Sequence, residues 1–571
     1  MPQDAFTIFH TSIELNGILA NSKIEKINQP KKDAVTLGLR TADKKNVILL
    51  ISANANGARV CITSNNQQAP LQAPAFCMLL RKHLARATIK CIEAVAYERI
   101  MIITFDCKDE LGTPSEKKAI VEIMGKYSNV TLVEKEIILG AMKTTDFDYN
   151  LTRPIFPGAK YVFPLPQNKL NAGSEKEIIK AYNAFEGNLE NFIFNKLRGV
   201  SKATADEIAF RFYGKNNIMR DIKKIKINDF ILYYQNFYNN AKPTPNVVFD
   251  KNYSDFFILD YKTVGGNKKY FESINSAIDY YYTEKETEAE FSSKKRKLTD
   301  ITKAHIKKLS KKLQTFKEKI LSANDADELK KNGELIIAYL YKIKPGDEYL
   351  IANDYTKDDY PEIKIKIDKN LTPQENAEKL FKRYTKLKKT VIATKPQIAE
   401  TEEQILYFEN ILCDINNAES AEDISDLTEE LIAASLIPAP KQRKNEKKKK
   451  SSYRNFCYLG FDISAGRNNV QNDRLVTEAE RADVWLHTKD YHSSHVIVHT
   501  KGKKVPAEVL LFASEICAYY STAKTGDKIP VDYTLRKFVK KPTGSALGNV
   551  YYTEQKTLLV TPNPHIENEL K

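Results

Sequence analysis

Short apolar runs separated by polar turns fill the first 170 residues of the chain. Brief apolar stretches bounded by turn-forming residues predict strands, whereas apolar positions at helical spacing predict helices. Strands are therefore expected at 47–51, 59–63, 100–105 and 129–133, and helices at 76–84 and 118–124. Prolines 154, 157, 164 and 166 end this segment. Residues 1–170 are predicted to form one α+β domain.

The pattern becomes helical over 171–245, around the segment Leu197-Arg-Gly-Val-Ser-Lys-Ala-Thr-Ala205. This segment has the spacing of a helix-hairpin-helix turn, in which backbone N–H groups at a helix start can hold a phosphate. Ser201 stands where the usual hairpin has its second glycine. A contact with RNA and a plain packing unit of two helices therefore both remain open for this domain.

Two long helical stretches dominate residues 246–437, after a short pair of strands expected at 256–259 and 265–270. In the first stretch the apolar spacings alternate between three and four, and in the second an apolar residue recurs every seven. The seam consists of Ile306, Leu309, Leu313, Phe316, Ile320, Tyr384, Val391, Ile398, Ile405 and Leu412, with Leu380, Leu387 and Phe408 in a partial second seam. This periodicity predicts a coiled coil.

The two helical stretches are separated by Gly346, Pro361 and Pro373, which predict that the chain turns back on itself. A long antiparallel hairpin is therefore expected, in preference to an ordinary helical bundle. Pro396 lies inside the second helix and is expected to kink it, because proline removes a backbone hydrogen bond and clashes with the preceding turn.

A basic linker is predicted over 438–452, where Pro438 and Pro440 precede the lysine-rich run 441–450. Residues 453–571 return to an α+β pattern. The net charge of +15 indicates a polyanionic partner, because lysine and arginine that neutralise nucleic-acid phosphates release condensed counterions. A generally lysine-rich composition gives the same charge, and a charge block is often simply solvated, so both readings stay open.

The motifs that mark common enzyme classes are absent from the sequence. It contains no Walker loop, Rossmann fingerprint, nucleophile elbow or His-Glu-x-x-His pattern. The seven cysteines are odd in number and form no Cys-x-x-Cys pair, which argues against a disulfide framework or a cysteine zinc site. No secretory signal and no apolar run of membrane-spanning length are apparent. We therefore expect a cytoplasmic recognition protein, with no enzymatic activity and no cofactor.

Polar and basic residues concentrate in short motifs near both ends of the chain, on loops and strand ends where a core does not require them. The C-terminal motifs are 466–474, 483–489, 494–498, 531–533 and 540–544, and the N-terminal ones are 76–83, 98–101 and 121–129. In this order they resemble the NFACT family of ribosome quality control factors. The resemblance covers nearly the whole chain. It implies an α+β multidomain fold: a glycosylase-like N-terminal α+β domain, a helix-hairpin-helix domain, a long antiparallel coiled-coil hairpin and a C-terminal α+β RNA-binding domain.

The pair Glu98-Arg99 occupies the position of the family's Asp-Arg pair, which the resemblance implies is needed to engage transfer RNA. Arginine can grip a phosphate or a base edge with two hydrogen bonds, and a carboxylate can accept from a base amine. Glutamate adds one methylene and so changes the reach. By spacing alone the pair would be a surface ion pair, which contributes little. Arg81, Lys82 and Lys126 are further predicted tRNA contacts, with solvated helix faces as the alternative.

Eleven C-terminal residues are predicted to contact RNA or the ribosome. They are Arg467, Asn468, Asn469, Asp483, Trp485, His487, Lys489, His495, Arg536, Lys540 and Lys541. Trp485 could stack on a base, but its strand-like surroundings favour a place in the core. Histidines 487, 492, 495 and 499 are not predicted to bind a metal, because a tetrahedral site needs four converging ligands and one strand–loop segment rarely supplies them.

The resemblance implies that the protein binds a large ribosomal subunit, through its rRNA, while peptidyl-tRNA and its nascent chain still obstruct that subunit. It would then recruit tRNA, alanyl-tRNA in particular, so that an untemplated alanine tail extends the stalled chain and marks it for proteolysis. The ribosome itself would form the peptide bonds, and a small RNA-binding protein could assist. The coiled-coil hairpin would extend along the subunit toward its stalk.

Two other classes of function are alternatives to this interpretation. A DNA-processing enzyme on the glycosylase-like fold would use an N-terminal proline, and Pro2 is present. Gln3, however, replaces the acidic residue that such chemistry uses. A surface fibronectin-binding adhesin is disfavoured by the missing signal peptide and by the pattern of cysteine use.

Overall fold

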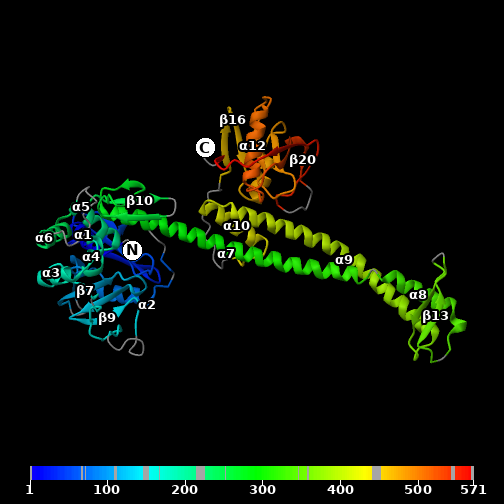
Figure 1. The fold of residues 1–571 in the computed structure, drawn as a ribbon, viewed down its shortest axis with the longest axis horizontal. Coiled ribbons are helices and arrows are strands. Elements are labelled where there is room, and N and C mark those ends of the chain that lie inside the picture. Colours follow the sequence, from blue (N-terminus) through cyan, green and yellow to red (C-terminus); the bar gives the residue numbers. More distant parts are fainter. Residues whose placement is uncertain are drawn as a thin grey trace. The chain divides into compact units, whose positions relative to one another are not determined.

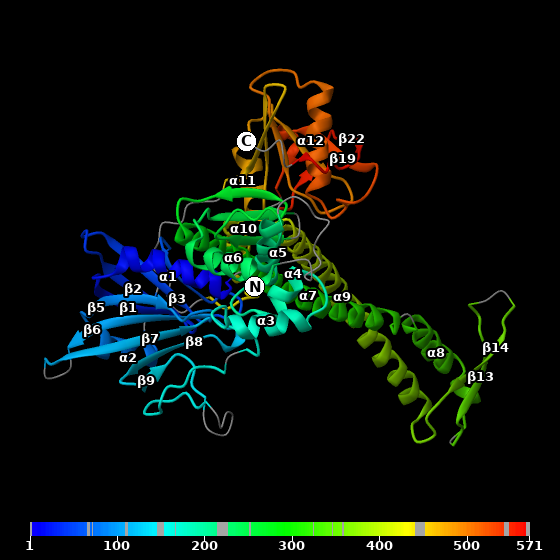
Figure 2. The ribbon, with the colours of Figure 1, turned by 60° about the vertical axis from the view of Figure 1, so that its left-hand side comes forward.

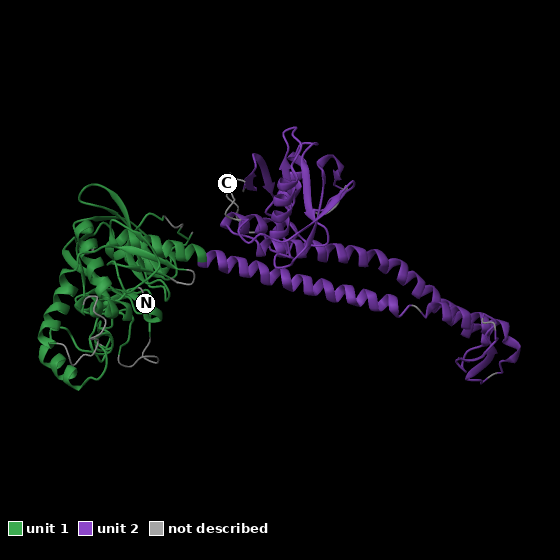
Figure 3. Cartoon of the chain, turned by 45° about the horizontal axis from the view of Figure 1, so that its top comes forward, with its two compact units in different colours: residues 1–288 green, residues 289–571 purple. Residues whose placement is uncertain are grey.

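The computed structural model describes residues 3–65, 69–70, 72–108, 112–145, 153–165, 167–213, 226–250, 253–323, 325–344, 346–356, 359–439, 452–541 and 547–566. Pro2, most of the predicted basic linker and Gly544 lie outside these ranges. The chain divides into two units, residues 1–288 and 289–571 (Figure 3). Each unit is considered by itself below.

A nine-stranded antiparallel sheet forms the body of the first unit (Figure 2). Its strands, in spatial order, are β4 (Arg59–Thr63), β3 (Asn46–Ser52), β2 (Ala34–Arg40), β1 (Lys23–Lys31), β5 (Thr88–Ala94), β6 (Ile100–Lys108), β7 (Pro114–Glu122), β8 (Asn129–Glu134) and β9 (Ile137–Ala141). Helices α1 (Ala5–Leu19) and α2 (Ala75–Leu84) bury their apolar residues in the same core cluster as the sheet. The short 3-10 helix η1 (Gly125–Tyr127) joins β7 to β8.

The predicted strands at 47–51, 59–63, 100–105 and 129–133 and the helix at 76–84 are confirmed. The helix predicted at 118–124 is wrong, because residues 118–122 lie in β7. Along β7 exposed Lys118 is followed by the apolar run Ala119-Ile-Val121, and the strand pairs with β6 on one side and β8 on the other. Pairing with two neighbouring strands over its length outweighs a short stretch of helical spacing.

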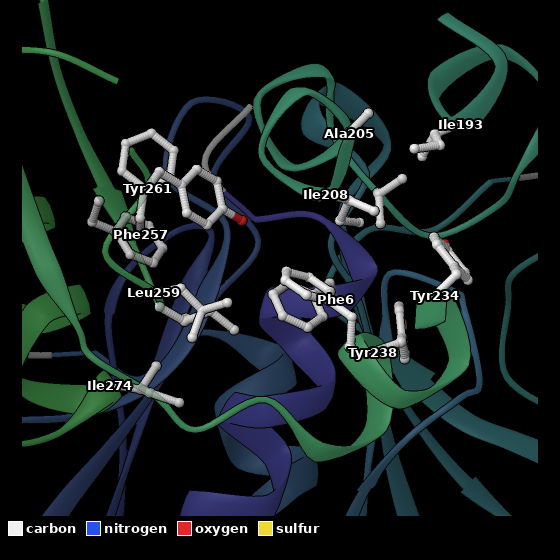
Figure 4. Close-up of a cluster of buried hydrophobic side chains, with 14 of the residues drawn as sticks. Phe6, Ile193, Ala205, Ile208, Tyr234, Tyr238, Phe257, Leu259, Tyr261 and Ile274 are labelled. Carbon is white, nitrogen blue, oxygen red and sulfur yellow. The ribbon is translucent and has the colours of Figure 1, made fainter. Parts of the chain in front are cut away.

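Four helices, α3 (Glu175–Ala184), α4 (Leu189–Lys196), α5 (Lys202–Tyr213) and α6 (Ile227–Asn240), follow the sheet. They pack with α1 through an aromatic-rich core that contains Phe6, Ile208, Tyr234 and Tyr238 (Figure 4). A three-stranded sheet adds to this core, in the order β11 (Tyr253–Phe257), β10 (Asn246–Asp250), β12 (Asn267–Tyr270). The strands predicted around 256–259 and 265–270 therefore do not pair with each other, because β10 lies between them.

The two long helical stretches are α7 (Ile274–Leu321) and α9 (Pro373–Asn416) (Figure 1). Within the second unit they run antiparallel: the ring of His305 lies 4.5 Å from that of Phe408, and Lys317 Nζ lies 2.8 Å from Glu402. α9 begins with a capping box of Thr372 and Glu375, which satisfies backbone donors at the helix start. It continues through Pro396 without interruption.

A small module lies between these helices in sequence, and the sequence pattern missed it. It consists of α8 (Ala326–Ala338), the 3-10 helix η3 (Leu340–Lys342) and the antiparallel pair β13 (Tyr349–Asn353) and β14 (Glu362–Lys366). Leu335, Ile336, Leu350 and Ile365 form its core. Gly346 and Pro361, which predicted a simple turn, instead precede these short strands, and Pro373 begins α9. After α9, helix α10 (Ala421–Ala433) packs back on the hairpin.

The C-terminal domain is built on a six-stranded antiparallel sheet. Its order is β15 (Arg454–Tyr458), β16 (Phe461–Ala465), β18 (Val496–His499), β17 (Val484–Thr488), β19 (Ile529–Leu535), β22 (Lys556–Val560); β20 (Val539–Lys540) pairs with β21 (Tyr551–Tyr552). Its other elements are α11 (Asn469–Glu478), α12 (Ala507–Tyr519) and the 3-10 helix η4 (Arg536–Phe538). The predicted α+β multidomain class is therefore confirmed.

Strand alternation gives this sheet two different faces. Val484 and Leu486 join the core cluster that contains α12, whereas Trp485 lies in a separate cluster with Leu475 of α11 and Ile497 of β18. The face opposite α12 therefore carries Trp485 and His487, and this face positions the C-terminal site described below.

Candidate nucleic-acid interface

Glu98 and Arg99 line a cavity of about 410 Å³ in the first unit. Its wall combines the loop before β6 with the start of α1 and the loop before α5. The lining residues are Gln3, Asp4, Ala5, Tyr97, Glu98, Arg99, Gln167, Lys169, Phe194, Arg198, Gly199, Val200, Ser201 and Lys202. The structure thus brings the family-like pair together with a second arginine, Arg198, which the sequence analysis did not single out as a site residue.

Arg198 holds the Glu98 carboxylate in place. Its Nη1 donates to Glu98 Oε1 at 3.0 Å, and its Nη2 donates to the carbonyl oxygen of Lys169 at 3.1 Å. Burial raises the pKa of Glu98, and the nearby Arg198 and Arg99 oppose that shift. Because Arg198 is anchored to the backbone, the Glu98 carboxylate is fixed rather than loosely solvated.

Arg99 is half-buried in the same cavity. Burial lowers the pKa of its guanidinium, and the carboxylates of Asp4 and Glu98 partly offset this effect. An arginine guanidinium remains charged in proteins. The cavity therefore presents a partly desolvated cation, which attracts an anion such as a phosphate more strongly than a fully hydrated one would.

Asp4 ties the beginning of the chain to α5. Its Oδ1 accepts from the N–H of Thr7 at 2.9 Å and caps α1, while its Oδ2 accepts from the N–H of Ser201 at 2.8 Å and the hydroxyl of Thr204 at 2.6 Å. The Ser201 N–H is the type of group that a phosphate-binding hairpin would offer to RNA. Here it is bound to the protein's own carboxylate, which favours the packing-unit interpretation of this segment.

The other predicted tRNA contacts lie outside the cavity. Arg81 and Lys82 are exposed on α2, and Arg81 Nε donates to the carbonyl oxygen of Ile27 at 2.9 Å. Lys126 is exposed on η1, with its ammonium 4.8 Å from the centre of the Tyr127 ring. These residues stay predictions of peripheral phosphate contacts.

The C-terminal motif residues Arg467, Asn468 and Asn469 have internal partners. Arg467 Nη1 lies 3.1 Å from Asp423 on α10. Asn468 caps α11 by accepting from the N–H of Gln471 at 2.9 Å. The Nδ2 of Asn469 donates to Glu430 on α10 at 3.0 Å. The motif therefore fastens the C-terminal domain to the end of the helical hairpin, and contacts of these three residues with RNA stay a prediction.

Two glycines allow this close packing. A Cβ at Gly466 would lie 2.1 Å from Asn472 Oδ1, and one at Gly548 would lie 2.5 Å from Asn469 Oδ1. Gly548 also has a positive φ of 83°, which side chains disfavour. Both positions need glycine so that the asparagines of α11 can approach the backbone.

Asp483 is a structural residue rather than a surface contact. It is 1% exposed, and its carboxylate accepts from the N–H groups of Thr500 at 2.9 Å and Glu480 at 3.0 Å. His499 Nδ1 lies 3.2 Å from the same carboxylate. Asp483 therefore joins the loop before β17 to the end of β18, and we attribute its place in the motif to this packing role.

Trp485 is 0% exposed, so a base cannot stack directly on it in this structure. Its ring is stacked with His487, at 4° between planes, and lies at 87° to His495. The core alternative for Trp485 thus fits the structure, and its interior position follows from strand alternation on β17.

A second cavity, of about 300 Å³, lies beside these rings. The lining residues are Leu406, Asn410, Asp414, Asn469, Asn472, Trp485, His487, Lys489, Asp490, Tyr491, His492, Ser493, His495, Gly548, Asn549, Val550 and Tyr552. Burial lowers the pKa of His487 to about 4 and that of His495 well below its ordinary value. Both rings are therefore neutral at physiological pH.

Of the predicted basic contacts, Lys489 lines this cavity and is exposed. Lys540 is exposed on β20 and pairs with Tyr551, next to the cavity residues Val550 and Tyr552. Lys541 forms an ion pair with Asp473. Arg536 Nε donates to the carbonyl oxygen of Val476 at 2.7 Å, so its guanidinium is partly committed to the fold.

Sequence reasoning missed two acidic residues near the second cavity. Asp414 lines it from α9, and burial raises the pKa of that carboxyl well above its ordinary value. Glu430 of α10 accepts from Asn469 and from the Tyr407 hydroxyl, and burial raises its pKa as well. From the sequence alone, Asp and Glu residues on charged helices are expected to face solvent. The packing of α9 and α10 against the C-terminal domain shows that these two are buried.

Within the described ranges, no three or more His, Cys, Asp or Glu side chains come together in a way that could hold a metal ion. In the same part of the chain no helix has the length and apolar character needed to cross a membrane.

Two protein-family models together match nearly the whole chain. A family model described as NFACT N-terminal and middle domains matches residues 4–451, and one described as NFACT protein RNA binding domain matches residues 454–551. The Rqc2 homolog RqcH of Bacillus subtilis (strain 168) is 32% identical over 591 residues, covering 100% of both chains. The Rqc2 homolog RqcH of Streptococcus pneumoniae serotype 2 is 32% identical over 578 residues, covering 99% of this chain and 98% of that protein.

Among solved structures, the N-terminal part of the fibronectin/fibrinogen-binding protein from Streptococcus suis is similar at 29% identity, with a TM-score of 0.43. The similarity covers 49% of this chain and 99% of that one.

Proposed function

Because the chain belongs to the NFACT family and carries its RNA-binding domain, we propose that it is a ribosome quality control factor. It binds large ribosomal subunits that are obstructed by peptidyl-tRNA and recruits tRNA to them. Alanyl-tRNA is the proposed substrate, so that stalled chains receive an untemplated alanine tail. The observation that carries the proposal is similarity over the full length to two proteins named Rqc2 homolog RqcH.

The cavity beside Arg99 supports tRNA binding in the N-terminal unit. A partly desolvated guanidinium can pair with a phosphate or a guanine edge, and the Glu98 carboxylate can accept from a base amine. Arg198 fixes that carboxylate at 3.0 Å, which compensates for the additional rotatable bond of glutamate. We therefore propose that Glu98 sustains tRNA engagement despite replacing the family's aspartate.

The long helices support contact with an extended ribosomal surface. In the second unit α7 and α9 expose many charged side chains outside their apolar seam, among them Lys307, Lys308, Lys311, Arg383, Lys386 and Lys389. Such a surface suits an RNA backbone, which is recognised chiefly through its phosphates. We propose that these helices act as the coiled-coil hairpin that reaches along the large subunit toward its stalk.

We propose that the chain itself is not an enzyme. Its role is to position tRNA and to stabilise the obstructed subunit, while the ribosome forms each peptide bond. A small RNA-binding protein is a proposed assistant, and the proposed location is the cytoplasm.

The test is to isolate the tagged full-length protein from its cells, sediment it through a sucrose gradient and sequence its bound RNA. Co-migration with large subunits and enrichment of tRNA-Ala are expected. Enrichment of another tRNA would change the amino acid of the tail. Protein that stays at the top of the gradient without RNA would contradict the proposal.

A matched pair of variants ties this result to the N-terminal cavity. Arg99→Ala removes the half-buried cation, whereas Lys176→Ala removes an exposed cation on α3. Loss of tRNA from the first variant alone, with both still co-migrating with large subunits, is the expected result. Equal retention of tRNA by both variants would show that the cavity does not engage tRNA.

A further inference from the structure

The cavity beside Trp485 combines flat aromatic walls with an opening to solvent. Tyr552 lies 4.7 Å from Trp485 between ring centres, and His487 lies 5.2 Å from His495. These four rings come from β17, β21 and the segment before β18. Such an arrangement favours a flat ligand, because rings can contact its face and its edge.

Hydrogen-bonding groups around the rings lack internal partners. Trp485 Nε1, His495 Nδ1 and Asp414 Oδ2 are buried without a hydrogen bond to any described residue. Asn410 and Asn549 line the cavity half-buried, and their side-chain amides form no hydrogen bond within the described ranges. An amide offers a donor and an acceptor together, which is the combination that the edge of a nucleobase matches.

The charges are arranged by depth. The interior holds two neutral imidazoles and the buried Asp414 carboxyl. None of these groups carries a positive charge, so the interior does not stabilise an anion. The exposed ammonium groups of Lys489 and Lys540 lie at the outside. A ligand that is neutral and flat at one end and anionic at the other fits this gradient.

We propose that this cavity receives one unpaired base of a bound RNA, with its faces against the rings and its edge at Asn410 and Asn549. Lys489 and Lys540 contact the adjoining phosphates. The proposal rests on the RNA-binding function proposed above and assigns that function a site where a base is read. Trp485 shapes the wall without stacking on the base itself.

Trp485 is the single tryptophan of the chain, so its fluorescence reports on this cavity alone. The full-length protein is titrated with RNA hexamers of each base and with an abasic hexamer that keeps all the phosphates. At least one intact hexamer is expected to change the emission and to bind roughly tenfold more tightly than the abasic one, since contacts between bases and aromatic rings strengthen RNA binding.

Variants separate base contacts from phosphate contacts. Asn549→Ala and Asn410→Ala are expected to weaken the intact hexamer about three- to tenfold and to leave the abasic hexamer unchanged. Lys489→Ala is expected to weaken both RNAs by the same factor, because it contacts phosphate only. An unchanged emission spectrum of each free variant shows that the domain has folded.

The inference is overturned if abasic and intact hexamers bind equally, or if both asparagine variants weaken the two RNAs alike. That failure is distinguishable from failure of the proposed function. Wild-type protein that co-sediments with large subunits yet shows no base dependence retains the function and loses this site. Protein that reads bases in the titration but never co-sediments keeps this site and loses the ribosomal function.

Discussion

The cavity beside Arg99 and the cavity beside Trp485 handle charge in different ways. The first holds a half-buried guanidinium and a carboxylate fixed by Arg198, so opposite charges lie close together in partial contact with solvent. The second keeps its histidines neutral by burial and leaves its lysines outside. A protein that must bind a polyanion and also discriminate among RNAs needs both kinds of site, because phosphates supply affinity and bases supply specificity.

The largest expected effect comes from removing the cation of the first cavity. Arg99→Ala should reduce tRNA recovered with the protein by tenfold or more, because a charge-assisted contact with the RNA is lost. Sequencing of co-purified RNA, normalised to large-subunit rRNA, measures the loss. If Arg99→Lys restored wild-type recovery, simple charge rather than the forked geometry of arginine would be the requirement.

A second effect concerns the stability of the C-terminal domain. Asp483→Ala leaves the N–H groups of Thr500 and Glu480 without their acceptor and should lower the free energy of unfolding of that domain by about 3 kcal/mol. Urea unfolding followed by Trp485 fluorescence isolates this domain from the rest of the chain. Asp483→Asn keeps one acceptor and should cost less, and equal losses in both variants would contradict the hydrogen-bond explanation.

Lowering the pH should change the contributions of His487 and Glu98, one in each cavity, to folding stability in opposite directions. His487 has a folded pKa of about 4, below the unfolded value, so between pH 6.5 and 4 the unfolded chain binds more protons and stability falls as pH falls. The folded pKa of Glu98 is raised, so the folded state binds more protons and this contribution to stability is lost as pH rises through that pKa.

The measurement is the difference between wild type and His487→Gln in unfolding free energy across that pH range. Wild type should lose about 2–3 kcal/mol more than the variant between pH 6.5 and 4. Asp414 of α9 and Glu430 of α10, which pack against this domain, titrate in the opposite direction, but they are present in both proteins and cancel in the difference. Parallel pH profiles would mean that His487 is already hydrated in the folded state.

The smallest expected effect lies outside both cavities. Lys126 is exposed on η1, so Lys126→Ala should weaken tRNA binding about twofold. The slope of log affinity against log salt concentration should fall in magnitude by about one, because one phosphate contact is lost. Filter binding at several salt concentrations measures both quantities. A loss as large as that of Arg99→Ala would show that η1 contributes as much to tRNA binding as the cavity beside Arg99.

Local patterns predicted those parts of the molecule that short-range chemistry determines. Strands such as β3 and β8, the helix α2 and the long helices α7 and α9 follow from apolar spacing. The pair Glu98-Arg99 was predicted as a site because it resembles the family's Asp-Arg pair, whose two residues are adjacent in sequence. Arg198, which completes that site, is separated from Glu98 by 100 residues, and no local pattern connects them.

The remaining misses have the same cause. The helical reading of 118–124 failed because pairing with β6 and β8 decides the conformation of β7. The internal partners of Arg467 and Asn469 were missed because Asp423 and Glu430 lie about forty residues away on α10. Partners distant in sequence decide whether a polar residue faces solvent or the protein interior.

The contacts of α1 have a consequence for how this protein is made. Asp4 caps α1 and accepts from Thr204, His10 contacts the backbone of Tyr238, and Glu14 accepts from the N–H of Ile274. Helix α1 therefore lacks these partners until residues near 274 have been synthesised. Contacts of such sequence separation form late in folding, so the N-terminal domain of each new copy should remain open during much of its own translation.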